Sequence, residues 1–397
     1  MPKHAQTSQA EYVDTPQALE QLCHKLRHAD VIAVDTEFIR EKTYFARLCL
    51  LQVASRDCVA CIDPLALDNL DALLEIFYAK DKLILLHAAR QDLEIFHDLW
   101  GRVPTPVFDT QIAAALLGYN DQIGYAKLVE NMLGVQLDKT AVRTDWSQRP
   151  LSEKQLAYAA DDVRYLLQLY PLIQQQLRQR NRLDWLTEDF AELGQAALYE
   201  KDPADSWKRV SGHGKLKPQQ LAILQKLAAW REIKARKRDK PRKWILADDL
   251  LLSLARQAPT SVEKLAKIRG FSAALVKNHG EELIQEIQAA LALPKEEWPA
   301  TAAYQRPTLE EECLVDILMT YLKTLAAENQ ISPASLTTRK EIEKLVRGER
   351  DLPLLHGWRA HIAGQPLLDM LAGRISLRVE QGRLCANRLE SDQDGQV

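Results

Sequence analysis

The sequence contains no apolar run that approaches the length of a membrane-spanning helix, so it predicts a protein with no membrane partner. Its first nine residues are polar and lack the apolar centre of a signal peptide. Six cysteines are scattered over 397 residues. We therefore expect reduced, structural cysteines in a cytoplasmic protein.

A cysteine cluster of the kind that holds zinc is also missing. Cys58 and Cys61 form one CxxC, inside the strand-like run 57–62. Residues three apart in a strand face opposite sides, and no second CxxC completes a set of four ligands. A structural zinc site of this kind is therefore excluded.

The chain as a whole has little net charge, but one region is strongly basic. The formal net charge is −3, whereas residues 208–243 carry 13 lysines and arginines against two acids. Seven of these basic residues lie within positions 234–243, an expected loop flanked by Trp230 and Trp244. Both tryptophans could stack on bases, although core tryptophans beside a solvated basic face would give the same pattern. The asymmetry favours a nucleic acid over a membrane surface, because no amphipathic insertion helix accompanies it.

The chain is too long for one ordinary core, so two or three globular domains are expected. Closely spaced strand patterns predict an antiparallel meander, and later strand–helix alternation predicts parallel crossovers. Together they predict an α/β domain with a mixed sheet flanked by helices. The expected strands are 31–36, 46–54, 58–63, 83–87 and 107–108, and the expected helices are 70–79, 91–99, 110–117, 125–133 and 153–177.

Acidic residues stand at the ends of these elements. Asp35 and Glu37 follow the apolar run 31–34, and their i, i+2 spacing places them on one face of a strand. Like charges this close repel each other unless a cation lies between them, and a divalent ion is the usual partner. Asp92 opens a helix after strand 83–87, and Tyr158 and Asp162 share a face of a later helix. Each position alone is more typical of a structural residue, but the set predicts a metal site.

The motifs Asp35-x-Glu37, His87-x4-Asp92 and Tyr158-x3-Asp162 resemble those of DEDD exonucleases, in the tyrosine-bearing branch. Segments 33–38, 108–111 and 145–152 resemble ribonuclease D, a family of that branch. The resemblance covers essentially the whole chain and implies a ribonuclease-H-like α/β exonuclease domain. It also implies a 3′→5′ exoribonuclease that releases nucleoside 5′-monophosphates, with tRNA precursors and other structured RNAs as substrates.

The resemblance also implies roles for individual residues. Four catalytic carboxylates would hold two divalent ions, Mg²⁺ or Mn²⁺, and Tyr158 would orient the attacking water. Tyrosine is a poor general base, because its unperturbed pKa is about 10. Helix caps explain Asp109 and Ser152. The four carboxylates are Asp35, Glu37, Asp92 and Asp162, and the candidate substrate contacts are Thr36, Phe38, His87, Arg143 and Arg149.

One of these candidate contacts, His87, has a specific competing explanation. A histidine whose hydrogen bonds are satisfied at the end of a strand is slightly favoured over a substrate contact there. Arg143 and Arg149 flank Trp146 in a loop, where they could hold phosphates of the incoming strand.

Beyond Trp207 the pattern becomes helical, with expected helices at 219–236, 248–256, 261–268, 272–278 and 281–293. Residues 236–249 resemble the HRDC module that ribonuclease D shares with RecQ-type helicases. A helicase is excluded because the chain has no GxxxxGK[ST] phosphate loop. Residues 309–377 look like a second, more divergent HRDC module. The expected domains are 1–206, 207–294 and 303–380, followed by a disordered tail, 381–397.

The residues by themselves indicate only a two-metal carboxylate site, so the strand direction and the RNA substrate come from the resemblance. A 3′→5′ DNA exonuclease with the same site is one alternative. A non-catalytic RNA-binding protein on a nuclease fold is another, although the complete set of five residues argues against it. We expect a monomer.

Overall fold

The computed structural model describes residues 10–138, 144–299 and 307–389. Within them the chain forms two compact units that do not follow chain order. The first unit comprises residues 10–37, 49–195 and 307–389, and the second comprises 38–48 and 196–299. The connection between two strands of the sheet therefore belongs to the second unit.

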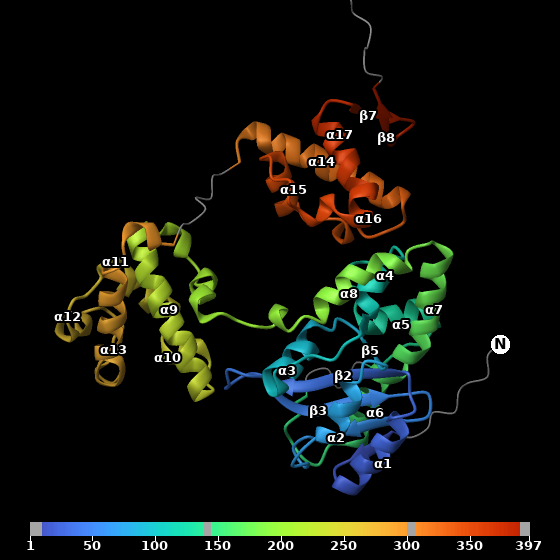
Figure 1. The fold of residues 1–397 in the computed structure, drawn as a ribbon, viewed down its shortest axis with the longest axis horizontal. Helices are drawn as coiled ribbons and strands as arrows, with labels where there is room; N and C mark the ends of the chain where they lie inside the picture. The colour runs from blue at the N-terminus through green and yellow to red at the C-terminus, as the bar shows by residue number, and fades with distance from the viewer. Residues whose placement is uncertain (1–9, 139–143, 300–306, 390–397) are drawn as a thin grey trace, which may run out of the picture. The chain divides into compact units, whose positions relative to one another are not determined.

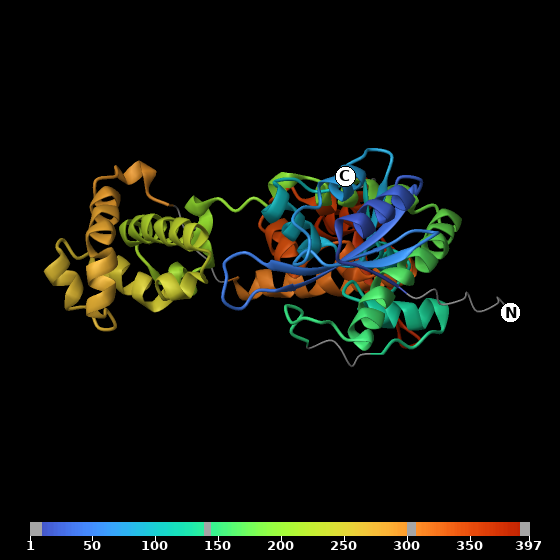
Figure 2. The ribbon, with the colours of Figure 1, turned by 90° about the horizontal axis from the view of Figure 1, so that it is seen from below.

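A mixed sheet forms the centre of the first unit (Figures 1 and 2). It has six strands in the order β1-β4-β3-β2-β5-β6. Strand β4 (Val59–Ile62) pairs in parallel with β1 (Glu11–Val13) and antiparallel with β3 (Arg47–Ala54). Strand β5 (Leu83–Leu86) is parallel to both β2 (Val31–Ile39) and β6 (Val107–Asp109). The predicted meander with later parallel crossovers is confirmed.

Helices lie on both sides of this sheet (Figures 1 and 2). One group packs on Ala33, Ala54, Leu85 and Phe108 of the strands. This group is α4 (Thr110–Ala115), α5 (Tyr125–Leu133), α6 (Glu153–Arg164) and α7 (Leu166–Gln179). Asp35 and Glu37 share the face of Ala33, because side chains alternate along a strand. The remaining early helices are α1 (Pro16–Leu26), α2 (Asp71–Phe77) and α3 (Arg90–Trp100).

Two helix predictions were wrong. The expected helix 153–177 is interrupted at Tyr165, between α6 and α7, where no glycine or proline signals a break. The two expected helices 272–278 and 281–293 form one helix, α13 (Ala273–Leu291). Gly280 lies inside α13, and a Cβ there would approach Val262 Cγ1 to 3.1 Å. This glycine therefore allows a close helix contact and does not end the helix.

The second unit packs α13 against α9 (Pro218–Arg238), with α10 (Arg242–Ile245), α11 (Asp248–Gln257) and α12 (Val262–Ala266) around them. Its core includes Tyr44, which is 3% exposed, from the β2–β3 connection. Asp239 accepts hydrogen bonds from the Tyr44 and Phe45 amides at 2.9 and 3.1 Å. The Tyr44 hydroxyl donates to the buried carboxylate of Glu232.

The C-terminal part of the first unit contains α14 (Leu309–Glu328), α15 (Arg339–Val346), α16 (Gly357–Arg359) and α17 (Gln365–Leu371). Trp358 stacks on Trp185 with ring centroids 4.5 Å apart, and Arg359 pairs with Asp189 at 2.8 Å. Trp185 lies in the short segment η1 (Leu183–Leu186), and Asp189 lies in α8 (Thr187–Leu193). These contacts join the C-terminal helices to the segment that follows α7.

The described residues end in a β-hairpin that was not predicted from the sequence. It pairs β7 (Ile375–Glu380) with β8 (Arg383–Arg388) through Gln381 and Gly382, both with positive φ. Alternating Ile375, Leu377 and Val379 before a two-residue turn was the signal for it. Residues 381–389 are therefore not the expected disordered tail, and 390–397 lie outside the described residues.

Candidate active site

Three of the predicted carboxylates converge. Asp35, Glu37 and Asp162 each offer an oxygen, and these oxygens all lie within 4.8 Å of one another. Asp35 and Glu37 come from β2, and Asp162 comes from α6 on the same side of the sheet. A capping box starts α6, in which Ser152 Oγ accepts from Gln155 N and Gln155 Oε1 accepts from Ser152 N. The predicted capping role of Ser152 is confirmed.

Asp92 lies in the first turn of α3 and is not part of this group of three. It is 7% exposed, and its Oδ1 accepts a 2.5 Å hydrogen bond from Thr36 Oγ1. Thr36 is 6% exposed and stands between Asp35 and Glu37. The Thr36 hydroxyl therefore binds the Asp92 carboxylate. Thr36 was predicted only as a substrate contact, and this role within the fold was not predicted.

Burial raises the pKa of every carboxyl group in the site, and the charges of the other site carboxylates add to this for Asp35 and Glu37. Burial and then the charges of Asp92, Asp162 and Glu37 raise the pKa of Asp35 well above its ordinary value. Burial followed by Asp162 and Asp92 raises the pKa of Glu37 to about 8. Burial is also the largest cause for Asp92 and Asp162, each with a pKa of about 7. A cation among these oxygens would remove the repulsion.

Tyr158 lies one turn before Asp162, and its ring centroid is 6.2 Å from that of Trp146. Burial, and then the charges of Asp162, Glu37 and Asp35, raise the pKa of its phenol. The hydroxyl therefore keeps its proton near neutral pH, which leaves it able to donate a hydrogen bond.

The turn before α3 depends on a residue whose role the sequence analysis only partly predicted. Asp109 caps α4 as expected, with Oδ1 accepting from Gln111 N at 2.8 Å. Its two oxygens also accept from Ala88 N at 3.0 Å and Ala89 N at 2.8 Å. Ala88 has φ +57°, a left-handed conformation that is costly for alanine. Asp109 thus stabilises the strained turn that leads to Asp92, a contact that chain spacing does not reveal.

The predicted phosphate contact of Arg149 conflicts with its position in the fold. Its Nε and Nη2 donate to Asp63 at 2.5 and 2.7 Å, and Nη2 also donates to the Cys49 carbonyl at 2.6 Å. Nη1 donates to the carbonyls of Trp146 and Gln148. All three nitrogens are thus used to fix the loop against the sheet. Arg143 lies outside the described residues.

His87 is also engaged within the fold, as the structural alternative predicts. Its Nδ1 lies 2.9 Å from Thr110 Oγ1 and its Nε2 lies 2.9 Å from the Ile123 carbonyl. Both ring nitrogens therefore have partners, and the ring packs edge-on against Tyr125. Phe38, another of the candidate substrate contacts, is half-buried.

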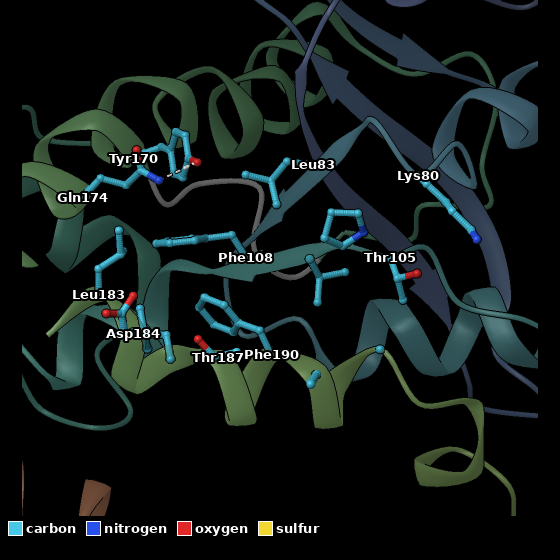
Figure 3. Close-up of a pocket in the computed structure, with 15 residues that line it drawn as sticks. Lys80, Leu83, Thr105, Phe108, Tyr170, Gln174, Leu183, Asp184, Thr187 and Phe190 are labelled. Atoms are coloured by element: carbon cyan, nitrogen blue, oxygen red, sulfur yellow. Dashed lines mark hydrogen bonds between the residues drawn. The ribbon is translucent and has the colours of Figure 1, made fainter. Parts of the chain in front are cut away.

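A pocket of about 530 Å³ adjoins the carboxylates and includes Asp162 and Tyr158 in its lining. Its other walls come from the start of α5 and from residues 137–138, and Lys127 and Lys154 also line it. A second pocket, of about 680 Å³, is mostly apolar and is shown in Figure 3. There Phe108 contacts Tyr170 and Phe190, and none of the predicted site residues takes part. The first pocket is the one that could hold a substrate beside the acids.

An α/β sheet that brings carboxylates together beside a pocket is typical of an enzyme that hydrolyses phosphodiesters with divalent metal ions. The family model for a 3′-5′ exonuclease matches residues 10–178, and the model for an HRDC domain matches residues 220–287. Ribonuclease D of Bartonella henselae is 38% identical, over 92% of this chain and 90% of its own length. Ribonuclease D of Sphingobium indicum is 39% identical, over 94% and 97%.

A solved structure agrees with these relatives. The crystal structure of Escherichia coli RNase D, described as an exoribonuclease involved in structured RNA processing, has a TM-score of 0.81 and 31% identity. The likeness covers 92% of this chain and 99% of that one. The chain therefore belongs to the ribonuclease D family, and it is an exoribonuclease.

None of the helices in the described part of the chain combines the length and apolar character that crossing a membrane requires.

Proposed function

We propose that this exoribonuclease removes nucleoside 5′-monophosphates one at a time from RNA 3′ ends in the cytoplasm, using two divalent ions, Mg²⁺ or Mn²⁺. The convergence of Asp35, Glu37 and Asp162 within 4.8 Å carries this proposal. The donors are hard carboxylate oxygens and include no histidine or cysteine, which suits Mg²⁺ or Mn²⁺ better than zinc. Such ions, when bound, supply an activated water and stabilise charge on the departing oxygen.

Different residues of the chain would bind the ions and orient the attacking water. Asp35, Glu37 and Asp162 would hold the ions, and Asp92, oriented by Thr36, would complete the set of ligands. Tyr158 would donate its phenol proton in a hydrogen bond that orients the attacking water, because its raised pKa rules out a phenolate base.

A Tyr158→Phe variant tests that orienting role. We expect turnover of RNA to fall about 10- to 100-fold, because a well-placed hydrogen bond is lost. Mn²⁺ affinity should stay close to that of the wild type, since the carboxylates are unchanged. Single-turnover kinetics and Mn²⁺ titration measure the two effects. RNA turnover at the wild-type rate in this variant would show that Tyr158 only packs and does not orient the water.

The second unit is proposed to contribute RNA contacts through one short segment. Arg236 and Arg242 donate to the Tyr44 hydroxyl at 3.0 Å, and Asp239 binds the Tyr44 amide, so these three residues are used internally. Lys237, Lys240 and Lys243 alternate with them and are exposed. Among the described residues the side chains of these lysines make no hydrogen bond or ion pair, and Lys240 Nζ lies 6.0 Å from the ring centroid of the exposed Trp244. Three cations beside an accessible aromatic ring suit a single strand of RNA.

Two parts of the earlier interpretation of this basic region need correction. Residues 234–238 belong to α9, so the expected basic loop is shorter. Trp230 is 6% exposed and donates to Glu282 at 2.9 Å, so it anchors the core. Trp244, at 60% exposed, is the tryptophan that can stack on a base.

Precursors of tRNA and other structured RNAs are the proposed substrates, acted on by a monomer. This follows from membership of the ribonuclease D family and from the activity stated for the Escherichia coli relative. The C-terminal residues 307–389 are proposed to be a divergent second HRDC-type module.

The decisive experiment follows a 5′-labelled RNA with a structured body and a single-stranded 3′ end. A ladder that shortens stepwise, with nucleoside 5′-monophosphates as the released products, is the expected result. Internal cuts would contradict exonuclease action. A matched DNA that is degraded as fast would favour the DNA exonuclease. No cleavage with either Mg²⁺ or Mn²⁺ would favour the non-catalytic alternative.

A further inference from the structure

Gln52, in the middle of β3, is fully buried, at 0% exposed. Neither its Oε1 nor its Nε2 has a hydrogen-bond partner among the described residues. A side-chain amide can accept two hydrogen bonds and donate two, and burying it without partners is costly. An apolar residue of the same length would fill this space without that cost, so the unpaired amide points to a polar group that binds there.

The position of Gln52 in the sheet identifies what it faces. Gln52 lies opposite Cys61 of β4 in the antiparallel register, and opposite residues share a face of the sheet. Cys61 Sγ lies 3.7 Å from the Leu156 carbonyl of α6. Gln52 therefore faces α6, the helix that carries Tyr158 and Asp162.

Gln52 also shares a face with Asp35. Strand β3 is the neighbour of β2 in the sheet. Ala54 and Ala33 belong to one core cluster on the side of α4–α7. Gln52 lies two residues before Ala54, and Asp35 lies two residues after Ala33, so alternation puts both on that side. The unpaired amide and the first carboxylate of the site thus stand on adjacent strands under the same helix.

The chemistry of the two groups is complementary. Ionised carboxylates only accept hydrogen bonds, and the amide Nε2 is a donor that carries no charge. A neutral donor can orient a metal-binding carboxylate without competing with the metal ion, as a cation would. No direct hydrogen bond joins the Gln52 side chain to any described residue. A buried water needs two to four polar partners, and the amide and the Asp35 carboxylate can provide two.

We propose that Gln52 is a positioning residue of the active site. Its amide holds a buried water that donates to the Asp35 carboxylate and orients it for metal binding. The water is bound without a metal, and only the consequence for metal binding rests on the proposed function.

The test replaces the amide by an apolar side chain of the same length, Gln52→Met. We expect the metal-free protein to melt roughly 2–8 °C higher, because one water satisfies only part of the hydrogen-bonding capacity of the buried amide, and methionine removes the remaining cost. Mn²⁺ should bind about tenfold more weakly, as for other residues that orient metal ligands. At saturating Mn²⁺, kcat should fall with an unchanged KM for RNA. Higher stability together with weaker metal binding is a signature that a purely structural glutamine would not produce.

Gln174→Met is the matched control. Gln174 Nε2 donates to Tyr170 Oη at 2.7 Å, in the apolar pocket of Figure 3. This variant loses a satisfied hydrogen bond away from the acids, so its melting temperature should fall and its Mn²⁺ affinity should not change. Gln52→Leu is a second apolar variant, which separates loss of the amide from a poor fit of the methionine.

A lower metal-free melting temperature in both Gln52 variants, with unchanged Mn²⁺ affinity, would overturn the proposal. Failure of the wild type itself to bind Mn²⁺ would instead overturn the two-metal function and the metal-binding part of this inference. The melting temperatures would still decide whether the amide is incompletely paired.

Discussion

Asp35, Glu37, Asp92 and Asp162 repel one another because burial keeps water from screening their charges. Burial raises the pKa of all four carboxyl groups, and the charges of the other site acids add to the shifts of Asp35 and Glu37, so the charged forms are disfavoured in the folded chain. A site built in this way is a source of instability until a cation enters.

The first prediction concerns Asp35→Asn. We expect nearly all RNA turnover to be lost, because a metal ligand loses its charge. We also expect the metal-free protein to gain about 1–2 kcal/mol of stability, because one source of repulsion is removed. Thermal unfolding in chelator and in Mg²⁺ measures this, and the wild type should gain more from the metal than the variant. Retained turnover would refute the role of Asp35.

The second prediction concerns pH. In the folded chain Glu37 has a pKa of about 8, and Asp92 and Asp162 have pKa values of about 7, well above the range of an unfolded chain. Between these limits the folded protein therefore binds more protons than the unfolded chain. Its stability should therefore fall as pH rises, by at least about 2 kcal/mol between about pH 5 and pH 8 without metal. Denaturant unfolding at several pH values measures the slope. Mg²⁺ should flatten it, and a stability that rises over this range would contradict the shifts.

At the scale of elements, the ends of helices decide where the site residues stand. Asp109 caps α4 and holds the two amides of the turn before α3, so it links two elements that are separate along the chain. The cap was predictable because an acid before a helix is a local signal. The second contact was not, because it depends on β5 and β6 being neighbours in the sheet.

The third prediction follows from this link. Asp109→Ala should cost about 2–4 kcal/mol, from a lost cap and from buried amides left unpaired. It should also weaken Mn²⁺ binding, because the turn that leads to Asp92 is no longer held. Thr308→Ala is the control, since Thr308 caps α14 in an exposed capping box. It should cost about 1 kcal/mol and leave Mn²⁺ affinity unchanged. If both variants changed Mn²⁺ affinity equally, Asp109 would not support the turn that leads to Asp92.

At the scale of the whole molecule, chain order and spatial organisation differ. Residues 38–48 interrupt the sheet in sequence yet form part of the helical second unit, while residues 307–389 belong with the sheet. Deleting everything after residue 207 would therefore leave Tyr44 without its core and also remove part of the first unit. Point substitutions on the second unit test RNA binding more cleanly than such a truncation.

The fourth prediction is a triple variant, Lys237→Ala, Lys240→Ala and Lys243→Ala. RNA affinity should fall, and the slope of log K against log salt should decrease by about 2, at about 0.7 for each lost phosphate contact. Filter binding at several salt concentrations measures both. Lys208→Ala is the control, because Lys208 is paired with Asp205 at 2.7 Å. An unchanged slope in the triple variant would show that RNA binds elsewhere.

Five of the six strands of the sheet, most of the helices and the positions of the acids were predictable, because they depend on local periodicity and on spacing within one element, whereas the edge strand β1 was missed. The partners of the polar groups became clear only from the packed fold: Arg149 and His87 are bound within it, Thr36 donates to Asp92, and the Gln52 amide is buried without a partner among the described residues. Spacing along the chain specifies the face on which a side chain lies. It does not specify which carbonyl or carboxylate from a distant segment will lie opposite, and those pairings form only when the elements pack.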